Sequence, residues 1–500
     1  MKIRIIASSD IHGAIMPISY GTGKETDSCF LKMIRKLEEY KTENTIYVDN
    51  GDNLQGTPLL KYYYDHKEGE NPVNICLNTI YDYLNIGNHD FDYGGEELLS
   101  FVEGFKGKCL CGNVFYNHKR IGEEYVIKEF DENNKIALIG CVTQYLVNYE
   151  KPENLCGFEL EDCYEYCKKT IAKIKEKEDV KAIVLVYHGG FEGNGEGKLS
   201  DDSGENEGYK MCQNLDFDIL ISGHQHLSLS TKIGNKIVTQ TAANAKEFAV
   251  IDYDLETRTG NCELIKVEGK IDEELEKRFL DLEDKTQAWL DESLGSVDRS
   301  LLVADQLEAR INKHPVISFI NMIQKEVTGA QLSANALFNV AIGFAKEITY
   351  RDLVSTYVYA NTLVKVKIDG KTLKKYLEKN AEYFDVKDGK ICVSEDYLKP
   401  VECHYNYDMV DGLDYVIKVS NPQGSRIIEM KYDDKEIKEN DEFTLVINNF
   451  RYGGSGGFEF LKDLEVLQRY DEDMVTVMAN YISRHKNIKV EHKENVRVMI

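Results

Sequence analysis

Five short segments of this chain place Asp, Asn or His at or beside a glycine, and four of them follow an apolar run rich in β-branched residues. Glycine lets the backbone turn sharply where a buried strand ends, and loops at such ends commonly carry functional side chains. The pattern therefore predicts ligands gathered at the ends of buried strands. The segments are residues 9–13 (SDIHG), 51–53 (GDN), 87–90 (GNHD), 187–190 (YHGG) and 223–226 (GHQH).

These segments supply carboxylate, carboxamide and imidazole donors, and they contain five of the eleven histidines. Such a mixture suits a divalent metal ion, and we consider Mn²⁺, Zn²⁺, Fe²⁺ and Co²⁺. A single Asp-x-His pair occurs by chance in many chains, but five such segments in one chain argue against coincidence. The donors are too many for one ion, so the sequence predicts a two-metal site that hydrolyses phosphate esters.

The spacing of the donors suggests how two ions share them. Asp10 and His12 are two residues apart, so they project to the same side of an extended strand end. Asp52 carries two carboxylate oxygens and can bridge both ions. We assign Asp10, His12, Asp52 and His226 to one ion, and Asp52, Asn88, His188 and His224 to the other. Two ions ~3.5–4 Å apart would activate a bridging hydroxide for in-line attack on an ester.

His89 directly follows the predicted ligand Asn88 and points in another direction. It is placed to donate a hydrogen bond or a proton to the phosphate or to the leaving oxygen. Asp92, three residues later, can hold the imidazole in orientation. We predict that His89 and Asp92 form the catalytic pair that does not bind metal.

Length, charge and hydropathy limit the class of protein. Five hundred residues exceed what one core usually supports, so at least two domains are expected. The net charge of −25 disfavours long nucleic acid and anionic membranes as partners, although a small nucleotide at a metal cluster remains compatible. No signal peptide or membrane-spanning run is present, so we expect a cytoplasmic location.

The first half alternates strand-like and helix-like segments, which indicates a layered α/β domain over residues 1–268. Residues 269–298 form a predicted connector, with one charged surface helix over residues 271–294. Residues 299–500 are predicted to form an α+β domain. Strands are expected at residues 2–7, 45–49, 82–86, 135–142, 182–186, 217–221 and 236–239, and helices at residues 30–40, 163–178, 206–214, 314–328 and 369–382.

The order D-x-H, G-D-N, G-N-H-D, H-G-G and G-H-x-H resembles that of the calcineurin-like metallophosphoesterases. Residues 88–92 (NHDFD) are similar to the N-H-E-F-D motif of the 5′-nucleotidase branch. Residues 359–363 (YANTL) and 448–454 (NNFRYGG) resemble the C-terminal domain of that branch. The resemblance implies a four-layer α/β/β/α sandwich that holds two metals, joined by a helix to a nucleoside-binding domain.

Residues 55–58 (QGTP) and 405–412 (YNYDMVDG) look more like the 2′,3′-cyclic-nucleotide 2′-phosphodiesterase/3′-nucleotidases. The 5′-nucleotidases proper carry an N-G-G-x-R segment, whereas residues 333–338 (SANALF) contain no arginine. We therefore expect hydrolysis of 2′,3′-cyclic nucleotides and of 3′- or 5′-mononucleotides. The alternatives are a 5′-nucleotidase, a UDP-sugar hydrolase, or a nucleotide-binding protein without turnover.

The resemblance also implies aromatic side chains that stack on the base of a small nucleotide substrate. Phe450 matches one stacking position and Tyr407 is assigned to the other, while Asn335 is expected to contact the base or the ribose. Stacking of this kind contributes about 1–3 kcal/mol per base and reads base identity loosely. The sequence leaves the oligomeric state open.

Overall fold

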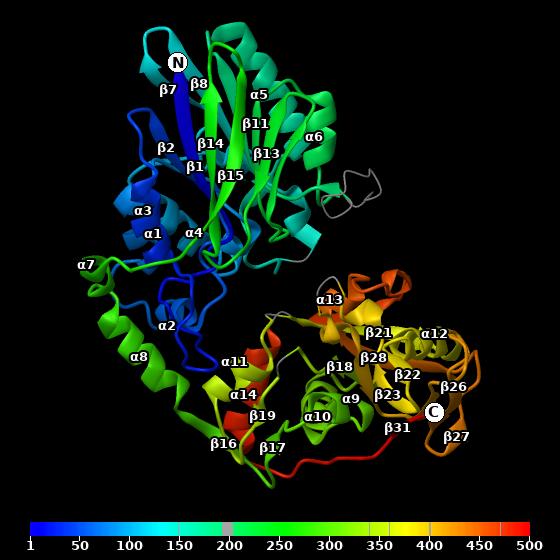
Figure 1. Cartoon of the computed structure of the whole chain (residues 1–500). Coiled ribbons are helices and arrows are strands. Elements are labelled where there is room, and N and C mark those ends of the chain that lie inside the picture. Colours follow the sequence, from blue (N-terminus) through cyan, green and yellow to red (C-terminus); the bar gives the residue numbers. More distant parts are fainter. Residues whose placement is uncertain (149, 193–203, 340, 360, 400–401, 471) are drawn as a thin grey trace. The chain divides into compact units, whose positions relative to one another are not determined.

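The computed structural model describes residues 1–148, 150–192, 204–339, 341–359, 361–399, 402–470 and 472–500. These residues form two compact units, drawn in Figure 1. The first unit comprises Met1–Ser19 and Gly23–Gln287, and the second comprises Tyr20–Thr22 and Ala288–Ile500. The main division, between residues 287 and 288, falls inside the predicted connector.

The first unit contains two six-stranded sheets. The first sheet has the strand order β15-β14-β1-β2-β3-β4. Its strands are β15 (Thr259–Lys266), β14 (Glu247–Asp254), β1 (Lys2–Ser8), β2 (Thr45–Asp49), β3 (Tyr83–Leu84) and β4 (Lys108–Cys109). The second sheet consists, in order, of β12 (Leu229–Ile233), β13 (Lys236–Gln240), β11 (Ile219–Ser222), β10 (Ala182–His188), β8 (Asn134–Val142) and β7 (Val126–Asp131).

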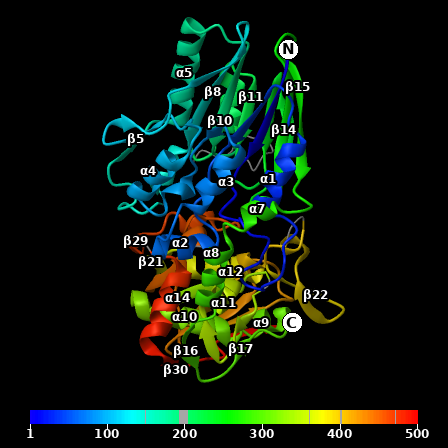
Figure 2. The same ribbon diagram turned by 90° about the vertical axis from the view of Figure 1, so that its left-hand side faces the viewer.

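The two sheets pack face to face with helices outside them. Ile3, Ile5 and Ala7 of β1 share one core with Val184 and Val186 of β10, so this core fills the space between the sheets. A second core joins the other face of the second sheet to α5 (Cys163–Lys177) and α6 (Gly208–Asn214). Figures 1 and 2 show α1 (Phe30–Glu39) and α3 (Pro72–Ile80) on the outer side of the first sheet. The predicted four-layer α/β/β/α sandwich is confirmed.

The first unit also contains shorter elements outside its two main sheets. The described residues include α2 (Pro58–His66), α4 (Gly95–Gly104), α7 (Glu273–Glu276), and 3₁₀ turns at Asn88–Phe91 and Gln144–Asn148. A small sheet has the order β6-β5-β9, formed by Lys119–Arg120, Val114–Tyr116 and Phe158–Leu160. The turn at Asn88–Phe91 carries part of the predicted site.

The predicted site segments all lie at or just beyond the carboxyl ends of parallel strands. β1, β2 and β3 are parallel neighbours in the first sheet, and β10 and β11 are parallel neighbours in the second. Asp10 follows β1, Asp52 follows β2, and His224 follows β11. Ligands in α/β sheets bind beyond these carboxyl ends, so the topology places the donors where a site is expected.

The prediction of one helix over residues 271–294 is wrong. The chain forms α7, then α8 (Leu280–Leu290), then strand β16 (Ser293–Val297). Between the helices, the amides of Arg278 and Phe279 donate to carbonyls three residues earlier, at 3.1 and 2.8 Å. This tight turn buries Phe279, and hydrophobic spacing alone cannot distinguish it from a continuing helix.

The second unit mixes sheets and helices, which confirms the predicted α+β class. Its central sheet consists, in order, of β24 (Asp408–Asp411), β18 (Leu332–Ala336), β28 (Glu442–Asn448), β21 (Leu363–Asp369) and β29 (Val466–Tyr470). A four-stranded sheet is formed by β27 (Lys435–Glu436), β26 (Ile427–Tyr432), β25 (Asp414–Lys418) and β31 (Val496–Met499). The smaller sheets join β16 to β20 (Glu347–Thr349) and β30 (Asn487–Ile488), β17 (Leu301–Leu302) to β19 (Gly343–Phe344), and β22 (Phe384–Lys387) to β23 (Lys390–Val393).

Helices cover these sheets, and several begin at capped positions that the sequence displays. Asp369 accepts a hydrogen bond from the amide of Thr372 and so caps α12, and Gly329 ends α10 in the left-handed region. The helices are α9 (Gln306–Ile311), α10 (Pro315–Thr328), α11 (Tyr350–Thr356), α12 (Gly370–Ala381), α13 (Asn449–Tyr452) and α14 (Met474–His485). Across the described parts of both units, every helix is too short or too polar to cross a bilayer.

Candidate metal centre

Five of the seven predicted metal ligands have a left-handed backbone. Their φ angles are 58° at Asp10, 50° at His12, 59° at Asp52, 73° at His224 and 59° at His226. Residues other than glycine seldom adopt this region, and each such residue costs on the order of 1–3 kcal/mol. Strain of this kind collects at functional sites, because there the surrounding structure fixes the conformation.

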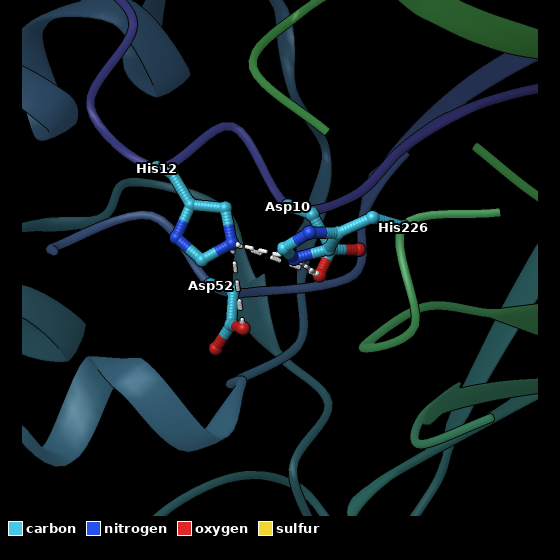
Figure 3. Close-up of side chains that lie close together, drawn as sticks. All are labelled: Asp10, His12, Asp52 and His226. Atoms are coloured by element: carbon cyan, nitrogen blue, oxygen red, sulfur yellow. Dashed lines mark hydrogen bonds and ion pairs between the residues drawn. The ribbon is translucent and has the colours of Figure 1, made fainter. Parts of the chain in front are cut away.

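The four residues predicted to hold the first ion lie together (Figure 3). Asp10, His12, Asp52 and His226 each present one ligand atom, and all four atoms are within 4.8 Å of one another. The Nε2 atom of His12 lies 3.0 Å from Nε2 of His226 and 3.7 Å from Oδ2 of Asp52. The Nε2 atom of His226 lies 3.4 Å from Oδ1 of Asp10. The structure therefore brings this predicted set together.

The residues predicted for the second ion lie in contact pairs beside Asp52. The Nε2 atom of His188 is 3.2 Å from Oδ2 of Asp52, and Nδ1 of His224 is 2.7 Å from Oδ1 of Asn88. The rings of His188 and His224 are 5.9 Å apart between centroids. Because Oδ2 of Asp52 faces both His12 and His188, Asp52 is the residue that the two sets share.

The unpaired atoms of this site fit a bound cation. Oδ2 of Asp52 and Nε2 of His188 are fully buried and lack a hydrogen-bond partner in the described structure. Nδ1 of His12 lies 3.0 Å from the carbonyl of Gln55, so a proton there leaves a lone pair on Nε2. Burial lowers the pKa of His12 to about 4, which keeps the ring neutral. Without an ion, Asp52 and the neighbouring imidazoles face one another 3.2–3.7 Å apart; burial opposes a positive charge, but the charge of Asp52 raises the pKa of His188 to about 9. A divalent ion would take the place of that proton and be bound by the same carboxylate and imidazole atoms.

Asp52 is held in its charged form. Burial opposes ionisation, but the neighbouring His188 and His89 lower the pKa of Asp52 well below its ordinary value. The other carboxylate oxygen, Oδ1, accepts a hydrogen bond of 2.7 Å from the amide of His89. A charged carboxylate with one oxygen fixed by the backbone and one free is suited to bind cations.

Two glycines are required by close approach to these ligands. A Cβ atom on Gly87 would lie 2.1 Å from Oδ1 of Asp52, and one on Gly223 would lie 2.3 Å from Oγ of Ser9 and 2.8 Å from Oδ2 of Asp10. Neither space can hold a methyl group. The glycines that mark the sequence segments therefore serve the packing of the site as well as its turns.

Asp90 has a structural role that sequence reasoning did not assign. Its fully buried carboxylate accepts hydrogen bonds of 2.8–3.0 Å from the amides of Asp52, Asn53, Leu54 and Gly87. Burial and the charge of Asp52 raise the pKa of Asp90 to about 7. Asp90 thus ties the loop after β2 to the loop after β3. The signal was its place in the GNHD segment, but only the structure shows which amides it binds.

The predicted catalytic pair is in contact. Nδ1 of His89 lies 3.1 Å from Oδ2 of Asp92, and the His89 ring is 5.5 Å from that of His12. Burial opposes the positive charge, but Asp92 and Asp52 raise the pKa of His89 to about 10. With its side chain 39% exposed, a protonated His89 can reach a ligand at the predicted ions.

Glu205 is a second residue that sequence reasoning missed. Its Oε1 atom lies 2.9 Å from Nε2 of His224, whose Nδ1 faces Asn88. The carbonyl of Glu205 accepts hydrogen bonds from Thr143 and Tyr187, at 2.9 and 3.2 Å. The chain segment around Glu205 has no apolar periodicity, so the sequence carries no signal for this contact.

Two of the three predicted nucleoside-binding residues are not accessible. Tyr407 is fully buried and stacks on Tyr383 with ring centroids 4.7 Å apart, so it has no free face for a base. Asn335 is fully buried in β18, where its side-chain amide donates to the carbonyl of Ala336. Both assignments are corrected: these side chains pack inside the second unit.

Phe450 remains available, and Tyr405 is the aromatic residue beside it. Phe450 is 39% exposed, and its ring centroid is 6.1 Å from that of half-buried Tyr405. Tyr405 also contacts the exposed ring of Tyr359, at 5.9 Å. A 3₁₀ turn at His404–Asn406 precedes β24. Strand alternation would place Tyr405 and Tyr407 on the same face, so it does not predict that only Tyr407 is buried.

The fold and the donor set define a metallophosphoesterase, and family comparison agrees. Residues 3–228 match the calcineurin-like phosphoesterase family, and residues 294–463 match the 5′-nucleotidase C-terminal domain family. The first unit therefore contains a calcineurin-like phosphoesterase domain, and the second unit contains a 5′-nucleotidase C-terminal domain. The resemblance inferred from the sequence is confirmed, and members of this class use divalent metal ions.

Individual relatives match over nearly the whole chain. A trifunctional nucleotide phosphoesterase protein of Bacillus subtilis is 26% identical over 99% of this chain, which spans 39% of that protein's length. A 2′,3′-cyclic-nucleotide 2′-phosphodiesterase/3′-nucleotidase of Yersinia enterocolitica is 25% identical over 100% of this chain and 88% of its own. A solved structure of a Staphylococcus aureus protein assigned as a 5′-nucleotidase is 27% identical, with a TM-score of 0.83 and full coverage of both chains.

Proposed function

We propose that this protein is a two-metal nucleotide phosphohydrolase that opens 2′,3′-cyclic nucleotides and removes phosphate from 3′- or 5′-mononucleotides. The observation that carries the proposal is the convergence of carboxylate and imidazole donor atoms around Asp52, where Oδ2 of Asp52 and Nε2 of His188 are buried without a hydrogen-bond partner in the described structure. The relatives named for these activities support the substrate class. Mn²⁺, Zn²⁺, Fe²⁺ and Co²⁺ all suit the donor set.

The chain's own residues divide the work of the reaction. Asp10, His12, Asp52 and His226 would hold one ion, and Asp52, Asn88, His188 and His224 the other. When bound, such ions supply an activated water and bring the phosphate into line for attack. Protonated His89 donates to the phosphate or the leaving oxygen, and Asp92 keeps the imidazole in orientation.

Nucleoside recognition falls to the second unit. Phe450 and Tyr405 offer neighbouring aromatic surface on which a planar base can stack. Stacking favours no particular base strongly, so we expect the enzyme to accept purine and pyrimidine nucleotides. Tyr405 replaces Tyr407 in this role because Tyr407 is buried.

A substrate panel with the Mn²⁺-loaded protein tests the proposal. We expect turnover of 2′,3′-cyclic AMP and 3′-AMP, with the Asp52→Asn variant as the inactive control. Release of phosphate from 5′-AMP alone would favour a 5′-nucleotidase, the assignment of the Staphylococcus aureus protein. Turnover of UDP-sugars alone would indicate a nucleotide-sugar hydrolase, and binding without turnover across the metal series would overturn catalysis altogether.

A further inference from the structure

A buried ion pair lies beneath the aromatic residues of the second unit. Arg451 is 1% exposed and Asp408 is 2% exposed. The Arg451 Nε atom donates to Oδ2 of Asp408 at 2.5 Å, and Nη2 donates to Oδ1 at 3.4 Å. The hydroxyl of Tyr376 donates to the same carboxylate at 2.6 Å. Both charges are thus paired and hydrogen-bonded out of contact with solvent.

The remaining donors of Arg451 bind two different chain segments. Nη2 donates to the carbonyl of Tyr405 at 3.0 Å, and Nη1 donates to the carbonyl of Ser455 at 2.7 Å. Arg451 itself directly follows Phe450 in α13. One guanidinium therefore connects the backbone that carries Tyr405 to the helix that carries Phe450.

The glycine-rich segment is shaped to meet this guanidinium. A Cβ atom on Gly456 would lie 2.4 Å from Oδ1 of Asn406 and 2.9 Å from Nη1 of Arg451. The ring of Phe458 lies 4.1 Å from the Arg451 guanidinium carbon. The guanidinium is thus closely packed as well as hydrogen-bonded.

A buried ion pair is not needed for stability, since apolar residues of similar volume often stabilise a fold as well or better. What a buried arginine adds is geometry, because its rigid planar fork binds several acceptors in fixed directions. Here those acceptors belong to the segments that carry the exposed aromatic pair.

We propose that Arg451, anchored by Asp408, is a positioning residue that sets the geometry of Tyr405 and Phe450 for stacking on the base of the substrate. The inference rests on the proposed function. It predicts that altering Arg451 weakens recognition of the nucleoside and spares the chemistry at the phosphate.

Two variants of the full-length, Mn²⁺-loaded protein test this role. Arg451→Lys keeps a charge beside Asp408 but loses the fork, and Arg451→Met with Asp408→Asn removes both charges together. Arg469→Met is the matched control, because Arg469 is an exposed arginine that lies 5.0 Å from the neighbouring Tyr452 ring. Folding is checked by circular dichroism and metal content by elemental analysis.

The measurements distinguish binding of the nucleoside from binding of the phosphate. With 2′,3′-cyclic AMP as substrate, we measure kcat, KM, and the inhibition constants of adenosine and of inorganic phosphate. In both Arg451 variants we expect KM and the adenosine constant to rise about ten-fold, the scale of one lost stacking contact. We expect kcat and the phosphate constant to stay within about two-fold, since the metal ligands are untouched. Arg469→Met should behave as wild type.

Two results would overturn the inference. Folded Arg451→Lys protein with wild-type adenosine inhibition would show that the fork does not set the aromatic geometry. An equal rise in the adenosine and phosphate constants would indicate a general structural role. Failure of the proposed function is distinguishable, because wild-type protein would then hydrolyse no nucleotide. If wild type is active and Phe450→Ala weakens adenosine inhibition while the Arg451 variants do not, only this inference fails.

Discussion

His89, the proposed catalytic residue, is distinguished from the predicted metal ligands by its contacts. Its amide hydrogen-bonds to Oδ1 of Asp52, while its ring turns to Asp92. His89 is therefore held both by its backbone amide and by its ring, and it is not one of the predicted metal ligands. Its pKa, raised to about 10, keeps the imidazole a proton donor at neutral pH.

The variant His89→Ala should lower kcat by roughly two to four powers of ten, the usual scale for a group that donates to the transition state. Metal content should stay near two ions per chain, because the seven donors remain. Elemental analysis alongside steady-state kinetics checks both expectations. Loss of both metals in this variant would show that His89 belongs to the ligand set.

Glu205 provides a prediction about metal affinity. If Nδ1 of His224 binds an ion, the proton on Nε2 is donated to Glu205, and this contact fixes the ring. We expect Glu205→Gln to weaken binding of one of the two ions by about 10–100-fold, the usual effect of losing such a support. Metal titration followed by calorimetry measures it.

Glu207→Gln is the control for this prediction, since its carboxylate pairs with Lys210 at 2.6 Å and has no contact with His224 among the described interactions. The role assigned to Glu205 would be refuted if both variants bound metal as tightly as wild type does.

At the scale of residues, the sequence predicts which side chains gather at the site, but it does not predict all of their contacts. The glycine-flanked segments predicted all seven donors that the structure brings together, because strand ends in a parallel sheet converge. The contacts of Asp90 and Glu205 depend on which amides and rings face them in space, and no spacing along the chain encodes that. Tyr407 was assigned from the family resemblance, and only the structure shows that its ring is buried after the 3₁₀ turn at residues 404–406.

At the scale of elements, the turns that follow the strands position the side chains of the site. The predicted strands at residues 2–7, 45–49 and 135–142 agree with β1, β2 and β8 within about one residue, since buried parallel strands read as continuous apolar runs. The prediction of one helix over residues 271–294 was wrong because Phe279 is buried in a tight turn. Its position in the sequence is also the one expected for the buried face of a continuous helix. Elements are thus predictable where pattern and burial agree.

The turn at Gly87 offers a test of this view. Gly87→Ala should force the loop after β3 away from Asp52, because the new methyl group would lie 2.1 Å from its carboxylate. We expect loss of at least one bound ion and a lower thermal unfolding midpoint. Gly69→Ala is the control: its φ of 86° strains alanine more than the φ of −100° at Gly87 does, but nothing lies within 4 Å of the new methyl group. Equal metal content in the two variants would contradict the argument.

At the scale of the whole molecule, the proposed function gives the two units different tasks. The predicted metal ligands belong to the first unit, and Phe450, Tyr405 and Arg451 belong to the second. The net charge of −25 gives no general attraction for a nucleotide, so binding has to come from ions and aromatic surface. This division also explains why two family models, rather than one, match the chain.

Removal of the metals should therefore leave nucleoside binding intact. After treatment with EDTA, we expect no turnover of 2′,3′-cyclic AMP and an adenosine Kd within about two-fold of the metal-loaded value, because separate sites contribute nearly independently. Phe450→Ala should give the reverse pattern, with weaker adenosine binding and unchanged metal content. Equilibrium dialysis measures the Kd, and loss of adenosine affinity on chelation would contradict the division.

The account depends most directly on two cations that share Asp52. Anomalous diffraction from crystals of the Mn²⁺-loaded protein tests this. We expect two peaks ~3.5–4 Å apart with the Asp52 carboxylate between them. One peak should contact Asp10, His12 and His226, and the other should contact Asn88, His188 and His224. A single peak, or two peaks that do not share Asp52, would contradict the account.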